Sequence, residues 1–294
     1  MKDFVITCSS TCDLSAYYLR KHNVYYVSFF YYLKEKKYYD DFYKEHSVSD
    51  YYNLIKINDV KTSQPDPNQY KELWLKLIEQ GYDILHIELS SGISGAVNSA
   101  LIAKSMIYDI NKEAKVHVID SLCCSTGYGL LIDKAVVQKE LGKNIDEVKD
   151  FIEDYKLNIN HIFMITNLDQ LIKGGRISKI AGNIGKILNI VPVLHVDNNG
   201  RLEVIKKSRG VNNAIEDILS LSKQNIFDGD NYNEKFFFCH ADTSELCNIL
   251  YNRFYDNYKK AIFDKEYIFN VGTVIGAHTG DGTISVFYYG DGRI

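Results

Sequence analysis

Three polar segments of this 294-residue chain combine hydroxyl groups, glycines and a histidine in a pattern that suits an anion. They are Thr62–Gln64, the serine-rich segment Ser90–Gly95, and Gly276–Gly282, which contains His278. Hydroxyls beside free backbone N–H groups at a helix N-terminus form a small anion site. Taken singly, each segment is also typical of ordinary capping and turns. Their joint presence predicts a pocket for a carboxylate or a phosphate.

The same residues allow a competing interpretation, a serine-dependent hydrolase or another small-molecule enzyme. Ser94, His278 and Asp281 could then form a catalytic triad. The Gly-x-Ser-x-Gly elbow is missing, however, because Ser90 and not glycine stands two positions before Gly92. Asp281 is also only three residues from His278. A carboxylate so close in sequence is poorly placed to bond the imidazole nitrogen that faces away from the serine. A protein that only binds and carries its anionic ligand, and an enzyme, therefore remain the two function classes.

Arginines are scarce, so their positions are informative. The chain has six arginines against 28 lysines. One of them, Arg176, follows a glycine pair in Lys173-Gly-Gly-Arg176. This spacing suits a guanidinium held where backbone passes closely, and equally an arginine that bonds the last carbonyls of a helix.

Missing motifs and composition exclude several classes of protein. The sequence has no phosphate-binding loop, no dinucleotide fingerprint, no Cys-x-x-Cys and no His-Glu-x-x-His. A net charge of −4 argues against a nucleic-acid partner. Neither a metal nor another cofactor is expected, because five of the eight histidines fall within strand-like runs, where packed histidines are more common than ligands. These five are His86, His117, His161, His195 and His240.

Cysteine content and hydropathy indicate a cytoplasmic protein without stable membrane insertion. Six cysteines in a chain of this size favour a reducing compartment over a disulfide framework. The longest apolar run, Val24–Leu33, is about half the ~20 residues that a membrane-spanning helix needs. The N-terminus lacks the apolar region of a secretory signal.

Hydrophobic periodicity and turn residues predict an α/β protein. In the first half, strands alternate with helices, which implies a mostly parallel sheet covered on both faces. Here we expect strands at Asp3–Thr7, Val24–Tyr32, Asp83–Leu89 and Lys115–Ile119, and helices at 13–21 (capped by Asp13), Val48–Ile57, 67–80 (capped by Asp66, with Pro67 in its first turn), Ala96–Ile110 and Ser125–Leu141. In the second half, Asp197–Gly200 predicts a hairpin turn. There we expect strands at His161–Thr166, Val191–Val196, Arg201–Lys207, Lys235–Cys239, Tyr267–Val271 and Thr283–Tyr289, and helices at Ile180–Ile190, Val211–Ser222 and Ser244–Lys259.

The fold class is therefore two packed α/β domains. The N-terminal domain, residues 1–163, would have a mostly parallel sheet flanked by helices. The C-terminal domain, residues 164–294, would have a mixed or antiparallel sheet, and the segment 62–80 could pack with it.

Taken together, the loops resemble those of the DegV family of bacterial fatty-acid-binding proteins, which includes FakB-like carrier subunits of fatty acid kinase. The resemblance extends over nearly the whole chain, and its combined pattern is specific. It rests on Ser9–Leu14, Thr62–Pro65, Ser90–Gly95, Ile119–Ser121 with Gly127 and Gly129, Leu171–Ser178, Pro192–Gly200 and Gly276–Gly282. The chain departs from the family pattern at Cys8, Asp66, Ala96 and Asp281.

The resemblance implies a carrier without catalytic residues that holds one long-chain fatty acid of the C14–C18 class, such as palmitate. The carboxylate would be met by Thr62 or Ser63, by Ser94 with the Gly95 backbone, and by His278. The acyl chain would run into an apolar tunnel in the N-terminal domain. A separate ATP-dependent fatty acid kinase would phosphorylate the presented carboxylate, and Arg176 and Arg209 would contact that partner or the phosphate.

Overall fold

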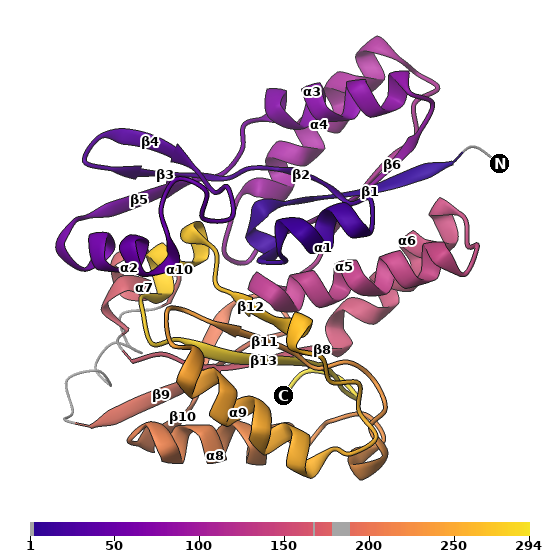
Figure 1. Cartoon of the computed structure of the whole chain (residues 1–294). Coiled ribbons are helices and arrows are strands. Elements are labelled where there is room, and N and C mark those ends of the chain that lie inside the picture. The colour runs from indigo at the N-terminus through magenta and orange to yellow at the C-terminus, as the bar shows by residue number, and fades with distance from the viewer. Residues whose placement is uncertain (1–2, 167, 178–188) are drawn as a thin grey trace.

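The computed structural model describes residues 3–166, 168–177 and 189–294, and these residues form three sheets (Figure 1). A four-stranded parallel sheet has the order β2-β1-β6-β7, and a six-stranded mixed sheet has the order β10-β9-β8-β13-β11-β12. A small antiparallel sheet has the order β4-β3-β5. The α/β class with one parallel and one mixed sheet is confirmed.

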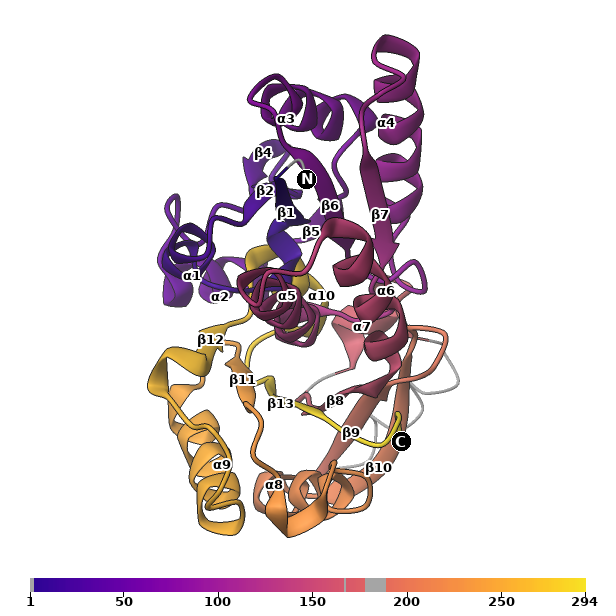
Figure 2. The same ribbon diagram turned by 90° about the vertical axis from the view of Figure 1, so that its right-hand side faces the viewer.

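The parallel sheet consists of β1 (Phe4–Ser9), β2 (Tyr25–Val27), β6 (Asp83–Glu88) and β7 (Val116–Asp120). Its two central strands, β1 and β6, have side chains that are buried on both faces. Helices α3 (Pro67–Glu79) and α4 (Ala96–Ile110) cover one face, and α5 (Ser125–Glu140) and α6 (Ile145–Tyr155) cover the other (Figure 2). The cap of α3 is confirmed, since Asp66 accepts from the Asn68 N–H and forms a capping box with Gln69. Helix α6 was missed, although Asn144 caps it in the same way.

The mixed sheet consists of antiparallel neighbours except for the parallel pair β11–β12. Its strands are β8 (Ile159–Met164), β9 (Ile190–Val196), β10 (Leu202–Arg209), β11 (Phe237–His240), β12 (Ile268–Asn270) and β13 (Ile284–Tyr289). Helices α8 (Val211–Ser222) and α9 (Ser244–Asn257) lie on its outer face (Figure 1). The predicted hairpin is confirmed, with β9 and β10 paired on either side of Asp197–Gly200.

Helix α5 lies between the two large sheets and packs against both (Figure 2). Eleven of its residues are buried, which is typical of a helix surrounded by protein on all sides. A Cβ at Gly127 would stand 2.3 Å from Nε2 of His161 in β8, so glycine permits this close approach. The domain boundary stays a prediction, and β8, at the expected limit of residue 163, pairs within the mixed sheet.

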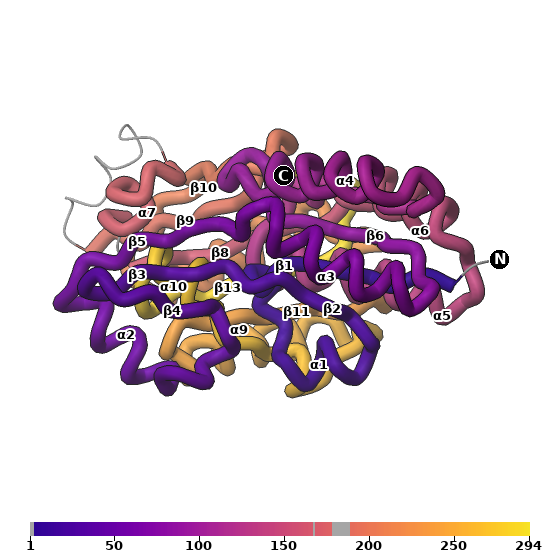
Figure 3. Tube along the Cα trace, turned by 90° about the horizontal axis from the view of Figure 1, so that it is seen from above, coloured from indigo at the N-terminus to yellow at the C-terminus, as the bar shows by residue number. Residues whose placement is uncertain are grey.

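The small sheet corrects one sequence prediction and adds two strands that were not predicted. The expected strand Val24–Tyr32 is wrong, because β2 ends at Val27 and β3 (Phe30–Leu33) belongs to another sheet. Between them, the Phe29 N–H donates to Ser10 Oγ (3.1 Å) and turns the chain out of the parallel sheet. The other two strands are β4 (Lys36–Tyr39) and β5 (Val60–Ser63). Seen from above, this sheet and α2 (Val48–Ile57) lie at the end of the molecule opposite the N-terminus (Figure 3).

The remaining helices complete the corrections. Asp13 is not the N-cap of α1 (Ala16–Lys21), which Ser15 caps; with left-handed backbone (φ 53°), Asp13 instead ends the short 3-10 helix Ser10–Cys12. Helix α7 spans Asp169–Lys173 and α10 spans Thr273–Thr279. The helix expected at Ile180–Ile190 lies outside the described residues except for its last two positions, of which Ile190 begins β9. Among the described residues, no helix is long and apolar enough to cross a membrane.

Candidate functional site

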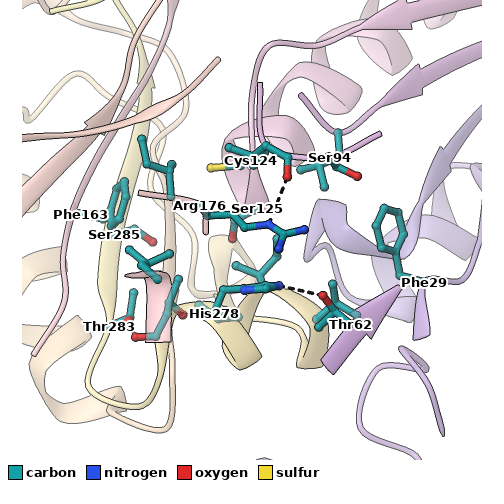
Figure 4. A pocket seen from close by; sticks show the side chains of 18 of the residues that line it. Phe29, Thr62, Ser94, Cys124, Ser125, Phe163, Arg176, His278, Thr283 and Ser285 are labelled. Atoms are coloured by element: carbon teal, nitrogen blue, oxygen red, sulfur yellow. Dashed lines mark hydrogen bonds between the residues drawn. The ribbon is translucent and has the colours of Figure 1, made fainter. Parts of the chain in front are cut away.

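A cavity of about 360 Å³ lies where five parts of the protein meet: the small sheet, the serine-rich segment Ser90–Gly95, α7, α10 and the mixed sheet (Figure 4). Its apolar wall comes from both halves of the chain: Phe29, Leu89, Ile93, Phe163, Leu171, Leu202, Val271, Val274, Ile275 and Phe287 line it. Thr62, Ser63, Ser94, Arg176 and His278 also line it. The structure therefore brings five predicted site residues to one cavity, although they are far apart in the sequence.

Thr62 and His278 form a hydrogen-bonded pair at this cavity, with 2.8 Å between Oγ1 and Nε2 (Figure 4). Both were expected in loops, and both expectations are wrong. Thr62 lies in β5, where pairing with Tyr31 of β3 fixes its orientation, and His278 lies in the last turn of α10. Gly174 allows the imidazole to sit against the end of α7, because a Cβ there would stand 2.3 Å from Nδ1.

The surroundings of His278 favour its neutral form. Burial, followed by the nearby charge of Arg176, lowers the pKa of His278 to about 4. At neutral pH the imidazole is therefore uncharged and offers one donor and one acceptor. If Nε2 carries the proton, the imidazole donates to Thr62 Oγ1 and leaves the threonine hydroxyl proton free for a ligand oxygen.

The lowered pKa predicts an acid-dependent loss of stability. Between pH 6.5 and about 4 the unfolded chain binds a proton at His278 that the folded, ligand-free protein does not. The free energy of unfolding should therefore fall as pH decreases through this window, by up to about 1.4 kcal/mol per pH unit for this group. Urea unfolding of ligand-free wild type and His278→Gln at several pH values tests this. The variant should show the smaller loss, and equal losses in both proteins would contradict the assignment.

Ser94 lines the cavity and has a hydroxyl proton available for a ligand. Its Oγ accepts from the Ala96 N–H (3.2 Å), and because that bond uses a lone pair, the hydroxyl can still donate. Gly95 directly precedes α4 and packs against the Gln64 side chain, which itself donates to Ser99 Oγ (2.8 Å). These contacts connect the segment Ser90–Gly95 to the end of β5. We call the edge of the cavity formed by Thr62, Ser63, Ser94 and Gly95 the polar rim.

The two predicted partner arginines occupy different places. Arg176 lines the cavity, and its guanidinium donates to the carbonyl oxygens of Ile93 (3.3 Å from Nε) and Gly174. Burial lowers the pKa of Arg176. Arg209 is exposed at the end of β10 and does not line the cavity. Arg176 thus fits both sequence interpretations, since it bridges two passing backbone segments and also bonds the carbonyl that ends α7.

The described contacts do not form the hydrolase triad. Nε2 of His278 meets Thr62, whereas the carboxylate of Asp281 pairs with Lys56 (2.9 Å). Ser94 Oγ makes its bond to the backbone of its own loop. The described residues also contain no cluster of three or more side chains able to hold a metal.

Several lining residues were not anticipated as site residues: Cys124, Ser125, Thr279, Thr283 and Ser285. Cys124 and Ser125 stand at the start of α5, directly after the Ile119–Ser121 motif, so the chain passage from β7 to α5 could have indicated them. Thr283 and Ser285 lie at or near the start of β13 and carry no local signal.

Comparison with known proteins agrees with this architecture. A family model described as "Uncharacterised protein, DegV family" matches residues 3–291. A DegV domain-containing protein of Clostridium perfringens is 32% identical over 293 residues, which cover 99% of each chain. A Thermotoga maritima protein, whose structure is described as revealing a fatty acid binding function, is 26% identical, with a TM-score of 0.84 over 99% of this chain and 100% of that one. The Fatty Acid Kinase B3 protein of Streptococcus pneumoniae, loaded with linoleic acid, shares the fold at 21% identity, with a TM-score of 0.84 over 98% and 100%.

Proposed function

Because this chain belongs to the DegV family, we propose that it binds one long-chain fatty acid in the cavity described above. One observation carries the proposal: an apolar cavity ends in the hydroxyl groups of Thr62 and Ser94 and the imidazole of His278, and the Arg176 guanidinium lines the same cavity. A ligand with an apolar chain and a single anionic end matches a cavity that is apolar along most of its wall and polar at one end. The family relative from Thermotoga maritima, described as binding fatty acid, supports the same ligand class.

The carboxylate would lie at the polar rim, with Thr62 or Ser63 on one side and Ser94 with the Gly95 backbone on the other. His278 would hold the Thr62 hydroxyl with its proton directed at the ligand. Hydroxyl and imidazole donors without full charge bind a carboxylate less tightly than a bidentate arginine clamp. This suits a head group that must react and leave, and the chain would carry its ligand without catalysing a reaction.

We further propose that a separate ATP-dependent fatty acid kinase phosphorylates the presented carboxylate. The position of Arg176 at the cavity and of Arg209 on the exposed end of β10 supports a role for both in meeting the partner or the phosphate. Arg209→Ala should leave fatty-acid affinity nearly unchanged and reduce acyl-phosphate formation with the kinase and ATP. Arg176→Ala should do the same with some loss of affinity, because it lines the cavity. Fluorescence titration and a phosphorylation assay at saturating ligand measure the two effects, with the exposed Arg253→Ala as the matched control. Wild-type phosphorylation rates in both variants would place the partner contact elsewhere.

The experiment that separates carrier from hydrolase is analysis of the purified protein itself. Denaturation, extraction into organic solvent and mass spectrometry should release a C14–C18 acid in a near-equimolar amount. An empty protein that hydrolyses p-nitrophenyl esters, and loses that activity in Ser94→Ala and His278→Ala, would favour the hydrolase.

A further inference from the structure

A second cavity, also of about 360 Å³, lies between α1, the segment after β4, and β12. We call it the acidic cavity. Its aromatic wall consists of Tyr17, Tyr18, Phe42, Tyr43 and Phe269, and its carboxylates are Asp13, Asp40 and Glu266. No lysine or arginine is among the described residues that line it. Aromatic faces and carboxylates without a cation are the surroundings that attract an ammonium group.

Two of these carboxylates are buried and incompletely bonded. Asp13 is 5% exposed and Asp40 is 2% exposed. Asp13 accepts through Oδ2 from Ser125, and Asp40 accepts through Oδ1 from the Thr273 hydroxyl (2.7 Å) and N–H (3.2 Å). Asp13 Oδ1 and Asp40 Oδ2 have no hydrogen-bond partner among the described residues. A buried carboxylate oxygen that is ionised and has no donor is costly, so either a proton or a bound donor group must satisfy it.

Neither carboxyl group has a counter-ion in the part of the chain that the structure describes, and the pKa of each is raised. Burial, followed by the charge of Asp40, raises the pKa of Asp13 well above its usual range. Burial raises the pKa of Asp40 as well, although the neighbouring polar groups of Thr273 and Ser10 oppose the shift. A bound cation would reverse both effects.

The backbone around the cavity is strained. Phe42 and Tyr43 are consecutive bulky residues in the left-handed region, with φ of 61° and 63°. This conformation is unfavourable for side chains of this kind and is often found where a ligand is held. Here it places both residues on the cavity wall.

The chain's own Lys21 shows which group this region accepts. Its ammonium lies 3.5 Å from the Glu266 carboxylate and 5.7 Å from the ring centre of Tyr17. Both partners line the cavity, whereas Asp13 and Asp40 are reached by no ion pair among the described contacts. The Lys21 ammonium thus pairs with Glu266 at one side of the acidic cavity, and the two buried carboxylates, Asp13 and Asp40, have no ammonium partner among the described contacts.

We propose that the acidic cavity binds a small organic cation with a primary ammonium group, whose N–H groups would donate to Asp13 and Asp40 and whose charge would rest against the aromatic wall. A primary ammonium fits better than a quaternary one because the unpartnered oxygens need donors and not only positive charge. This site is separate from the fatty-acid cavity and does not depend on its assignment.

The test measures thermal unfolding of the full chain with n-butylammonium chloride as the probe. Saturating probe should raise Tm by about 5 °C, and tetramethylammonium chloride, which has charge but no N–H donors, should raise it less. Sodium and magnesium chloride at equal ionic strength should have no comparable effect. A rise equal to that of n-butylammonium with either inorganic salt, or no rise with n-butylammonium, would overturn the proposal.

Variants assign the effect to this cavity. Asp40→Asn and Asp13→Asn should abolish the probe-dependent shift, whereas the exposed Asp109→Asn should keep it. Since a buried substitution can impair folding, Lys21→Met provides an independent arm: removing the competing ammonium at Glu266 should lower the probe concentration for half-maximal shift several-fold. An unchanged or higher concentration in Lys21→Met, or an undiminished shift in folded Asp40→Asn, would contradict the assignment.

Discussion

The double variant Thr62→Ala, Ser94→Ala is expected to lose fatty-acid affinity by roughly 10²- to 10⁴-fold while remaining folded. Each hydroxyl would supply one hydrogen bond to a charged carboxylate, worth about 1.5–3 kcal/mol, and the two sides of the rim should act nearly independently. Thr62 lies in β5 and Ser94 in the loop before α4, and neither belongs to the buried apolar core. Fluorescence titration with a labelled fatty acid measures the loss.

The matched control is Ser91→Ala, because this exposed serine shares the loop with Ser94 and does not line the cavity. It should bind as wild type does, and Tm should be similar in all three proteins. Unchanged affinity in the double variant would contradict the position of the head group. His278→Gln, which retains a donor beside Thr62, should lose less affinity than His278→Ala.

Shortening the ligand is expected to weaken binding by about as much as removing the polar contacts. Each buried methylene contributes about 0.8 kcal/mol, so octanoate, with eight fewer carbons than palmitate, should lose about 6 kcal/mol, or roughly 10⁴-fold in affinity. Smaller ordering costs for the shorter chain would reduce this loss, to not less than about 10³-fold. We expect this dependence on chain length because ten apolar side chains from both halves of the protein line the cavity.

Displacement of a fluorescent fatty acid by octanoate, decanoate, laurate and palmitate, each below its critical micelle concentration, measures this dependence. Hexadecanol serves as the control for the head group, since it keeps the chain and loses the carboxylate. Similar affinities across the acid series would mean that the apolar cavity does not hold the chain, and would favour a site for a small polar anion.

Local interactions determined much of this architecture from the sequence alone. The observed bounds of α2, α4 and α8 match the predicted Val48–Ile57, Ala96–Ile110 and Val211–Ser222. The cap at Asp66 and the hairpin at Asp197–Gly200 were also predictable. Such features depend on hydrogen bonds and side-chain spacing within a few residues, which the order of amino acids specifies directly.

The tertiary structure alone decided which distant residues meet. Thr62 and His278 are 216 positions apart, and their contact requires β5 to pair with β3 and α10 to pack beside it. Val24–Tyr32 was predicted as one strand because its composition suits either sheet, whereas in the structure a tertiary hydrogen bond from Phe29 to Ser10 lies between β2 and β3. Asp13 was predicted to cap a helix, yet its burial beside Asp40 depends on segments that are remote in sequence. Residue types and spacing specify local hydrogen bonds, but the pairing of remote strands and the burial of charge follow from how the whole chain packs.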